Sequence, residues 1–278
     1  VRIMAYTNID DPSAYFQTKI YTGDGNNNRA ITNDGNSDLQ PDFIWLKDRN
    51  VGFGHRLTDS TRGITKNLAS ETTGAESTST TQYASWNTDG FTLIYGGQQV
   101  PNYDGHTYVA WQWKANGGTT VSNTEGNVTN TLQVNQDAGF SISKFPSAAS
   151  GNTTFGHGLG VTPDMFIVKV ASAGGGWWVN HKGLTNRTTK YLGLHSTAAE
   201  GTVSWGAAPS STLITASADF IGSGNTSVVC YAFAEKQGYS KFGKYVGNGN
   251  ANGSFVYTGF KPAWIMLKPS SAADNWII

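Results

Sequence analysis

The sequence has few charged side chains, and neither sign of charge is in excess. Charged residues make up 14% of the 278 positions, against roughly 25% in ordinary globular proteins. Lys plus Arg and Asp plus Glu both number 19, so the net charge is zero. Binding to nucleic acid or to an anionic membrane surface depends on a basic excess or a basic stripe. The composition therefore disfavours both kinds of partner.

Cysteine and long apolar runs are also scarce. The single cysteine, Cys230, leaves no partner for an internal disulfide, which excludes a disulfide-stapled framework. No run of about 18 apolar residues is present that could cross a membrane as a helix. Residues 1–4 are not followed by the apolar stretch of a secretory signal. We expect a protein that is made in the cytoplasm and does not insert into a membrane.

Glycine and aromatic residues are abundant instead. Glycine occupies 34 of the 278 positions, and there are 9 Trp, 12 Tyr and 13 Phe residues. Average proteins contain about 7% glycine, and disordered chains lack such an aromatic load. Many turn residues combined with large aromatic rings predict an all-β protein.

One short string occurs three times along the chain: a proline, an apolar run and a lysine. The copies span residues 41–47, 163–169 and 262–268. Proline cannot donate to a β-ladder and suits the first position of a strand. Four apolar residues in a row predict a strand that is buried on both faces. The lysine is expected where each strand leaves the core.

A second string alternates aromatic residues with small or polar ones at residues 109–113 and 229–233. The alternation has the period of two that is typical of a strand. We therefore predict core positions for four rings and a buried, unreactive Cys230 at the position that Ala110 holds in the first copy. The four rings are those of Trp111, Trp113, Tyr231 and Phe233.

These repeated strings predict tandem β-sandwiches of about one hundred residues, of a jelly-roll or lectin-like kind. The strand order is left open. The expected parts are an N-terminal docking segment (1–17), repeat one (18–118), a linker (119–137), repeat two (138–242) and an incomplete third repeat (243–278). For the third repeat we expect either a continuing polypeptide, which we favour, or pairing with another subunit.

Several ordered motifs together resemble a known family. They include Ile9–Phe16, Tyr21–Gly25, Gln40–Lys47, His55–Gly63 and Gly238–Gly243. The chain resembles a repeat family of marine tailed bacteriophages whose members are labelled virion structural or tail-fibre proteins and have no assigned mechanism. The resemblance implies a virion component. It implies no ligand and no catalytic residue.

Carboxylates are the first candidates for catalysis, because polysaccharide-cleaving enzymes need a pair of them. The candidates are Glu71, Glu76, Glu200 and Glu235. Glu76 and Glu200 occupy the same repeat position, which favours a structural role as a turn acceptor. We predict no catalytic residue and no cofactor.

Metal ligation is the second candidate chemistry. Asp24, Asn26 and Asn28 alternate as calcium ligands do, but the glutamate that an EF-type loop needs at its twelfth position is missing. The five histidines have no zinc spacing. We predict turn chemistry and no metal site.

Two contact sites remain. Trp177 and Trp178 are adjacent, so one of them should face away from the core of a strand. We expect Trp178 in the core and Trp177 exposed, where it could contact a glycan or a subunit together with Asn180 and His181. In the N-terminal segment, Tyr6, Tyr15 and Phe16 are the expected docking anchors.

The sequence thus favours a non-enzymatic structural component of a bacteriophage virion: a fibre, an appendage or a decoration. Its expected partners are other virion proteins and copies of itself. The alternative is an adhesin that binds a host-surface glycan, and a polysaccharide-degrading enzyme is the third hypothesis. No nucleic acid is expected as a partner.

Overall fold

The structure is a computed structural model that describes residues 7–95, 97 and 101–278. Its regular elements are almost all strands, with one 3-10 helix, η1 (Pro12–Ala14), and one short α-helix, α1 (Ala218–Ile221). The prediction of an all-β protein is confirmed. Within the described ranges, no helix is long and apolar enough to cross a membrane.

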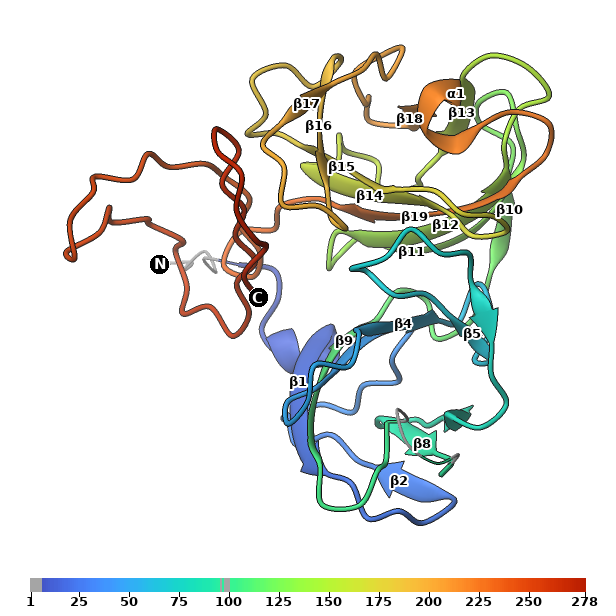
Figure 1. The fold of residues 1–278 in the computed structure, drawn as a ribbon, viewed down its shortest axis with the longest axis vertical. Helices are drawn as coiled ribbons and strands as arrows, with labels where there is room; N and C mark the ends of the chain where they lie inside the picture. Colours follow the sequence, from blue (N-terminus) through green and yellow to red (C-terminus); the bar gives the residue numbers. More distant parts are fainter. Residues whose placement is uncertain (1–6, 96, 98–100) are drawn as a thin grey trace, which may run out of the picture.

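The strands form two groups that lie one above the other (Figure 1). Group one contains β1 (Phe16–Thr22), β2 (Arg29–Ile31), β3 (Phe43–Asp48), β4 (Arg56–Asp59), β5 (Lys66–Asn67), β6 (Ser77–Thr78), β7 (Tyr83–Trp86), β8 (Phe91–Leu93) and β9 (Thr107–Trp113). Group two contains β10 (Val121–Asn123), β11 (Asn130–Asn135), β12 (Phe140–Pro146), β13 (Thr153–Gly156), β14 (Met165–Val170), β15 (Trp177–His181), β16 (Lys190–Gly193), β17 (Gly201–Thr202), β18 (Leu213–Ala216) and β19 (Ser227–Phe233).

Each group has one large sheet and smaller sheets beside it. In group one the large sheet has the order β1-β9-β3-β4, next to β2-β8-β7 and β5-β6. In group two the large sheet has the order β10-β11-β12-β19-β14-β15-β16-β17, next to β13-β18. Each group has its own apolar core, built around Phe91 in group one and around Phe155 in group two.

The two large sheets share one pairing order and one register. The order β1-β9-β3-β4 corresponds to β12-β19-β14-β15, and every neighbouring pair is antiparallel. Trp113 of β9 lies between Phe16 and Phe43, and Phe233 of β19 lies between Phe140 and Met165 in the same way. The smaller pairs β2-β8 and β13-β18 correspond as well.

A third core lies between the two large sheets and joins the groups. Phe43 of β3 stacks on Tyr231 of β19, with 4.4 Å between the ring centroids. Both belong to one cluster of buried residues from both groups. Ile44 and Leu46 belong to the group-one core instead. Strand β3 is therefore buried on both faces, as its apolar run predicts, because one face meets its own group and the other meets group two.

The aromatic strands β9 and β19 contribute to this shared core. Trp113 and Tyr231 are buried, and Trp111 and Phe233 are partly buried against the same cluster. The predicted core position is thus confirmed for Trp113 and Tyr231, whereas Trp111 and Phe233 are only partly buried. Cys230 is also buried, and burial raises the pKa of its thiol well above the ordinary value. The prediction that it is an unreactive core residue agrees with this environment.

An aspartate anchors the start of each proline-led strand. The carboxylate of Asp42 accepts hydrogen bonds from the backbone N–H groups of Ala115, Gly117 and Gly118, at 2.7, 2.8 and 2.6 Å. Asp164 accepts from the backbone N–H of Glu235 at 2.6 Å. These bonds tie the end of β9 to the start of β3, and the end of β19 to the start of β14.

The structure differs from the sequence expectations at three places. The expected linker, residues 119–137, contains β10 and β11, which belong to the large sheet of group two, with Leu132 and Gln133 buried. The expected docking segment 1–17 overlaps β1, which begins at Phe16. The lysine of the repeated string does not always leave the core, because Lys169 is fully buried.

The C-terminal segment, residues 243–278, has no strand, so the strand expected at 262–268 is also wrong. The segment contains a single β-bridge, between Leu267 and Ile277. It contains no counterpart of β9 or β19, and a lone hairpin without further strands is not stable by itself. It packs instead with Trp264 and Trp276 against the core between the sheets.

Candidate functional site

A cleft of about 740 Å³ opens where group one, group two and the C-terminal segment meet. Group one lines it from β1, β3 and β9, group two from residues 194–197, and the C-terminal segment from residues 275–278. Three of the lining side chains are indoles, those of Trp45, Trp111 and Trp276. Aromatic walls with a few polar groups are typical of ligand sites, which makes this cleft the candidate site.

His55 is held in the wall of this cleft by two hydrogen bonds. Its Nδ1 accepts from Nε1 of Trp45 at 2.8 Å, so Nε2 carries the proton of the neutral ring. Its backbone N–H donates to Oε2 of Glu71 at 3.1 Å. Burial lowers the pKa of His55, and the opposing effect of the Glu71 carboxylate does not restore it. His55 is therefore neutral at pH 7 and can act as a hydrogen-bond donor, not as a charge.

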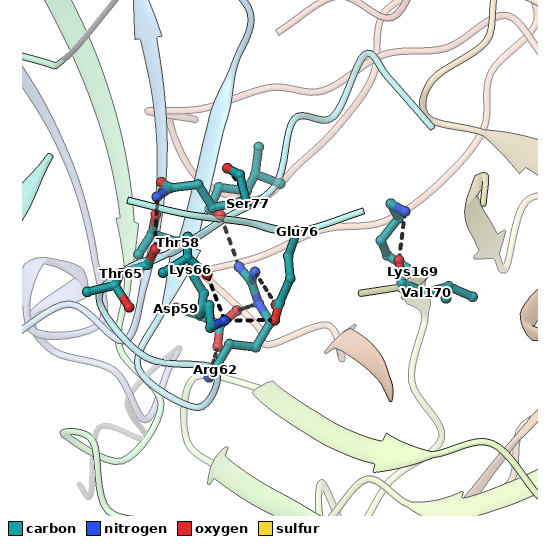
Figure 2. A network of polar contacts seen from close by, with 12 residues as sticks. Thr58, Asp59, Arg62, Thr65, Lys66, Glu76, Ser77, Lys169 and Val170 are labelled. Atoms are coloured by element: carbon teal, nitrogen blue, oxygen red, sulfur yellow. Dashed lines mark hydrogen bonds and ion pairs between the residues drawn. The ribbon is translucent and has the colours of Figure 1, made fainter. Parts of the chain in front are cut away.

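A buried ion pair lies close to the interface between the groups (Figure 2). Arg62 donates from Nε to Asp59, and from Nη2 to the carbonyl of Leu57 at 2.9 Å. The hydroxyl of Tyr231, from group two, donates to Oδ2 of Asp59 at 2.7 Å. Both charged side chains are almost fully buried. The network therefore ties β4 of group one to β19 of group two.

The electrostatic balance at Arg62 favours its charged form. Burial alone would lower the pKa of the guanidinium, but the charges of Asp59 and Glu76 raise it above its ordinary value. Burial raises the pKa of the Tyr231 hydroxyl well above its usual range, so that this group stays a neutral donor. The network thus holds one fixed pair of charges and performs no proton transfer near neutral pH.

Lys169 is a second buried cation near the same interface. Its Nζ donates to the carbonyl of Val170 at 2.7 Å and lies 6.0 Å from the ring centroid of Trp177. Burial, together with the charge of Arg62, lowers its pKa to about 8. The folded protein therefore binds the proton of Lys169 less tightly than the unfolded chain does, because few acceptors offset the lost hydration of the ammonium.

This burial predicts a pH-dependent contribution to stability. Below about pH 8, Lys169 is protonated in both the folded and the unfolded state, and its effect is constant. Between about pH 8 and about pH 9.5, the unfolded chain holds the extra proton, so the free energy of unfolding should rise by roughly 1–2 kcal/mol relative to Lys169→Met. Urea denaturation of both proteins across that range measures the difference. A constant difference would show that Lys169 keeps its proton in the fold.

Trp177 is not the exposed residue that the sequence predicts. It is fully buried in the core between the sheets, and its Nε1 donates to the carbonyl of Ala69 in group one at 2.9 Å. Trp178 is the partly buried member and packs on Phe220 of α1. The expectation failed because both faces of this sheet are covered. Trp177 is thus unable to stack on a sugar ring.

Asn180 and His181 are also engaged within the chain. Asn180 is fully buried; its Nδ2 donates to the carbonyl of Arg187 and its Oδ1 accepts from Nε of the same residue, both at 2.8 Å. Nδ1 of His181 accepts from the backbone N–H of Gly183. Burial, with the charges of Arg187 and Lys182, lowers the pKa of His181 to about 4. These two residues do not form an open site with Trp177.

The expected docking anchors lie in different environments. Tyr6 lies outside the described residues. Tyr15 packs against Tyr239 of group two, and Phe16 is the first residue of β1 and packs against Trp113 and Trp264. Tyr15 and Phe16 thus join parts of this chain, and contact with another protein stays a prediction.

The candidate carboxylates are spread over the molecule. Glu76 lies within 3.4 Å of Arg62, and Glu200 accepts from the backbone N–H of Thr185 at 3.2 Å. Glu235 pairs with Lys182. Only Glu71 lines the cleft. The sequence did not predict that Trp45 and His55 line a cleft with Glu71. No local motif connects residues that come close together only in the folded chain.

The asparagine-rich strings form turns. The carboxylate of Asp24 accepts from the backbone N–H of Asn26 at 2.9 Å, and Asn28 has a positive φ of 59°. Asn248 accepts from the N–H of Asn250 in the same way. Among the residues that the structure describes, no group of three or more His, Cys, Asp or Glu side chains could hold a metal ion.

Comparison with known proteins identifies a family. The family described as "Domain of unknown function (DUF7483)" matches residues 11–278, almost the whole chain. The chain belongs to this family. No curated protein and no solved structure matches the chain. The family match covers both groups of strands and the C-terminal segment together, so all three parts belong to one family unit.

Proposed function

We propose that the chain consists of repeated β-sandwich units, with group one as the first unit, group two as the second and residues 243–278 as the start of a third. The shared strand order and register of the two large sheets support this organisation. So does one antiparallel pairing that recurs in all three parts between residues ten positions apart. The pairs are Leu46 with Arg56, Val168 with Trp178, and Leu267 with Ile277.

A side-chain hydrogen bond recurs in the same three places. The lysine that ends each repeated string donates from Nζ to the carbonyl of the next residue. The distances are 2.6 Å for Lys47, 2.7 Å for Lys169 and 2.8 Å for Lys268. The C-terminal segment, which has no strand, thus has the local geometry of β3 and β14 at this point.

We propose further that the protein is a non-enzymatic structural component of a larger assembly. The observation that carries this proposal is the apolar core between the units, which contains Phe43, Trp177 and Tyr231. An apolar interface of this kind holds two units as one rigid body. The buried charges near it, those of Asp59 and Arg62, are used to join strands and do not face a substrate.

The resemblance to virion proteins of tailed bacteriophages suggests the assembly: a fibre, an appendage or a decoration of the particle. The partners would be other virion proteins and copies of the chain itself. Immunogold electron microscopy of purified particles, with an antibody against this chain, tests the proposal. We expect label at one fixed position on the particle. Label that is confined to the lysate of infected cells and absent from particles would contradict it.

A second function, binding of a host-surface glycan, is favoured by the cleft. Trp111 and Trp276, which are partly exposed, provide faces on which a sugar ring could stack, and His55, held by the buried Trp45, provides a hydrogen-bond donor. A glycan array tests this alternative. Binding that is lost in Trp111→Ala would support glycan recognition. An array that shows no binding would contradict it and leave the structural role as the remaining proposal.

A further inference from the structure

A loop of the first unit forms hydrogen bonds with a hairpin turn of the second unit. We call residues 69–76 the first clasp loop and residues 169–177 the hairpin that receives it. The carbonyl of Ala69 accepts from Nε1 of Trp177 at 2.9 Å, and the carbonyl of Thr73 accepts from the N–H of Gly175 at 2.8 Å. The N–H of Glu76 donates to the carbonyl of Ala171, also at 2.8 Å.

The same three bonds occur again between the second unit and the C-terminal segment. The carbonyl of Gly193 accepts from Nε1 of Trp276 at 2.8 Å, and the carbonyl of Thr197 accepts from the N–H of Asp274 at 2.8 Å. The N–H of Glu200 donates to the carbonyl of Ser270 at 2.9 Å. Residues 193–200 are thus a second clasp loop, and residues 268–276 are its receiving hairpin.

The correspondence between the two clasps holds atom by atom. Each residue of the second clasp loop lies 124 positions after its counterpart (193 against 69, 197 against 73, 200 against 76). Each residue of the second receiving hairpin lies 99 positions after its counterpart (276 against 177, 274 against 175, 270 against 171). One head-to-tail interface is therefore used twice. Such an interface closes into a ring if its rotation divides a full turn, and otherwise extends into a filament.

Ring contacts between the C-terminal segment and the first unit favour closure after three units. In the first interface, Phe43 packs against Phe140, the first residue of β12, at 6.2 Å between centroids. Trp264 has the repeat position of Phe43, and it packs against Phe16, the first residue of β1, at 6.4 Å. The third unit thus contacts the first as the first contacts the second. Figure 1 shows the three parts around a common centre.

The first unit has the same hairpin at residues 47–55, and that hairpin holds no clasp loop. Seven residues separate Lys47 from His55, as they separate Lys169 from Trp177. Arg49 has the position of Ala171, but it is exposed whereas Ala171 is buried. Among the described residues, no hydrogen bond reaches the carbonyl of Arg49 or the N–H of Phe53. This hairpin borders the three-part cleft, where Lys47, Arg49 and His55 are exposed to it.

From these contacts we infer that the hairpin at residues 47–55 binds the clasp loop of a complete third unit, closing a ring of three units. The inference rests on the proposed repeat organisation. The occupant is a loop of the kind found at 69–76 and 193–200, which presents a carbonyl to the N–H of Phe53 and an N–H to the carbonyl of Arg49. In this arrangement the cleft is an assembly surface and is filled by protein.

The test is a full chain with the third unit completed. Ile278 has the repeat position of Val179, so a second copy of residues 180–242 is fused behind it. We expect backbone hydrogen exchange at residues 49–55 to slow at least tenfold in this fusion, while the protein stays a monomer in sedimentation. The matched control carries an eight-residue Gly/Ser stretch in place of the appended copy of 193–200, and its exchange at 49–55 should equal that of the unfused chain.

Either of two results with the folded fusion would overturn the inference. One is a folded fusion whose exchange at 49–55 matches that of the control. The other is a fusion that forms larger oligomers as its concentration rises, because the interface would then extend and not close. If the fusion does not fold, a synthetic peptide of residues 190–202, added to the unfused chain, should slow exchange at 49–55, and a scrambled peptide should not. Failure of that peptide would also overturn it, whereas the immunogold result is independent of all three.

Discussion

Replacing Arg62 with methionine should lower the free energy of unfolding by about 3–5 kcal/mol, because removal of one partner of a buried ion pair leaves the other charge uncompensated. Asp59 would keep only neutral donors, the hydroxyl of Tyr231 among them. The loss also reaches the second unit, since Nη2 of Arg62 lies 3.3 Å from that hydroxyl. Guanidinium denaturation followed by tryptophan fluorescence measures the change.

Two comparisons make this prediction specific. Arg49→Met removes an exposed arginine with no ion pair in the described residues, and should change stability by no more than about 0.5 kcal/mol. Combining Arg62→Met with Asp59→Leu removes both charges, and should recover part of the loss. A double variant that is less stable than the single variant would mean that the charge of Asp59 is compensated by other groups.

Truncating Trp177 to alanine should cost about 3–5 kcal/mol, the range for a large aromatic side chain removed from a core. The ring is fully buried between the two units and makes the bond to Ala69 that begins the first clasp. Trp177→Phe keeps the six-membered ring, removes the five-membered ring with its Nε1 donor and leaves the carbonyl of Ala69 without that partner, so it should cost about 1–3 kcal/mol, less than alanine does. Thermal unfolding of the three proteins measures both losses.

The matched control is Phe255→Ala in the C-terminal segment, whose side chain is 89% exposed. It should leave the melting temperature within about one degree of the wild-type value, because little apolar surface is uncovered. Equal losses for Trp177→Ala and Phe255→Ala would contradict the assignment of Trp177 to the shared core.

Local patterns in the sequence were sufficient to predict strands β3 and β9. The apolar run 43–46 gave a buried strand, and the alternation at 109–113 gave β9, because period and burial are properties of a few consecutive residues. The 3-10 helix at Pro12–Ala14 begins with a proline and is capped by Asp11, and both residue types are common at the start of a helix.

The interface between the units could not be predicted in the same way. The alternation rule assumes one covered face, so it assigned Trp177 to solvent, although the large sheet of the second unit is covered on both faces. The pairing of Tyr231 with Asp59 joins residues 172 positions apart, and no local motif marks it. The cleft residues Trp45 and Trp276 are also far apart in the sequence and come together only in the folded chain, so no local pattern predicts the cleft.

The clasps rely mainly on main-chain atoms, and this has a consequence for how such a chain can change during evolution. Every residue except proline has the carbonyl and the N–H that Thr73 and Glu76 use, so most side chains of a clasp loop can be exchanged without loss of its main-chain hydrogen bonds. The two loops here already differ, with Ala-Ser-Glu-Thr-Thr-Gly-Ala-Glu at 69–76 and Gly-Leu-His-Ser-Thr-Ala-Ala-Glu at 193–200. In the proposed repeat organisation, the units can therefore diverge on their outer surfaces while the main-chain hydrogen bonds between them are kept. A single gene can in this way acquire several unlike faces on one scaffold, which a homo-oligomer of identical chains cannot do.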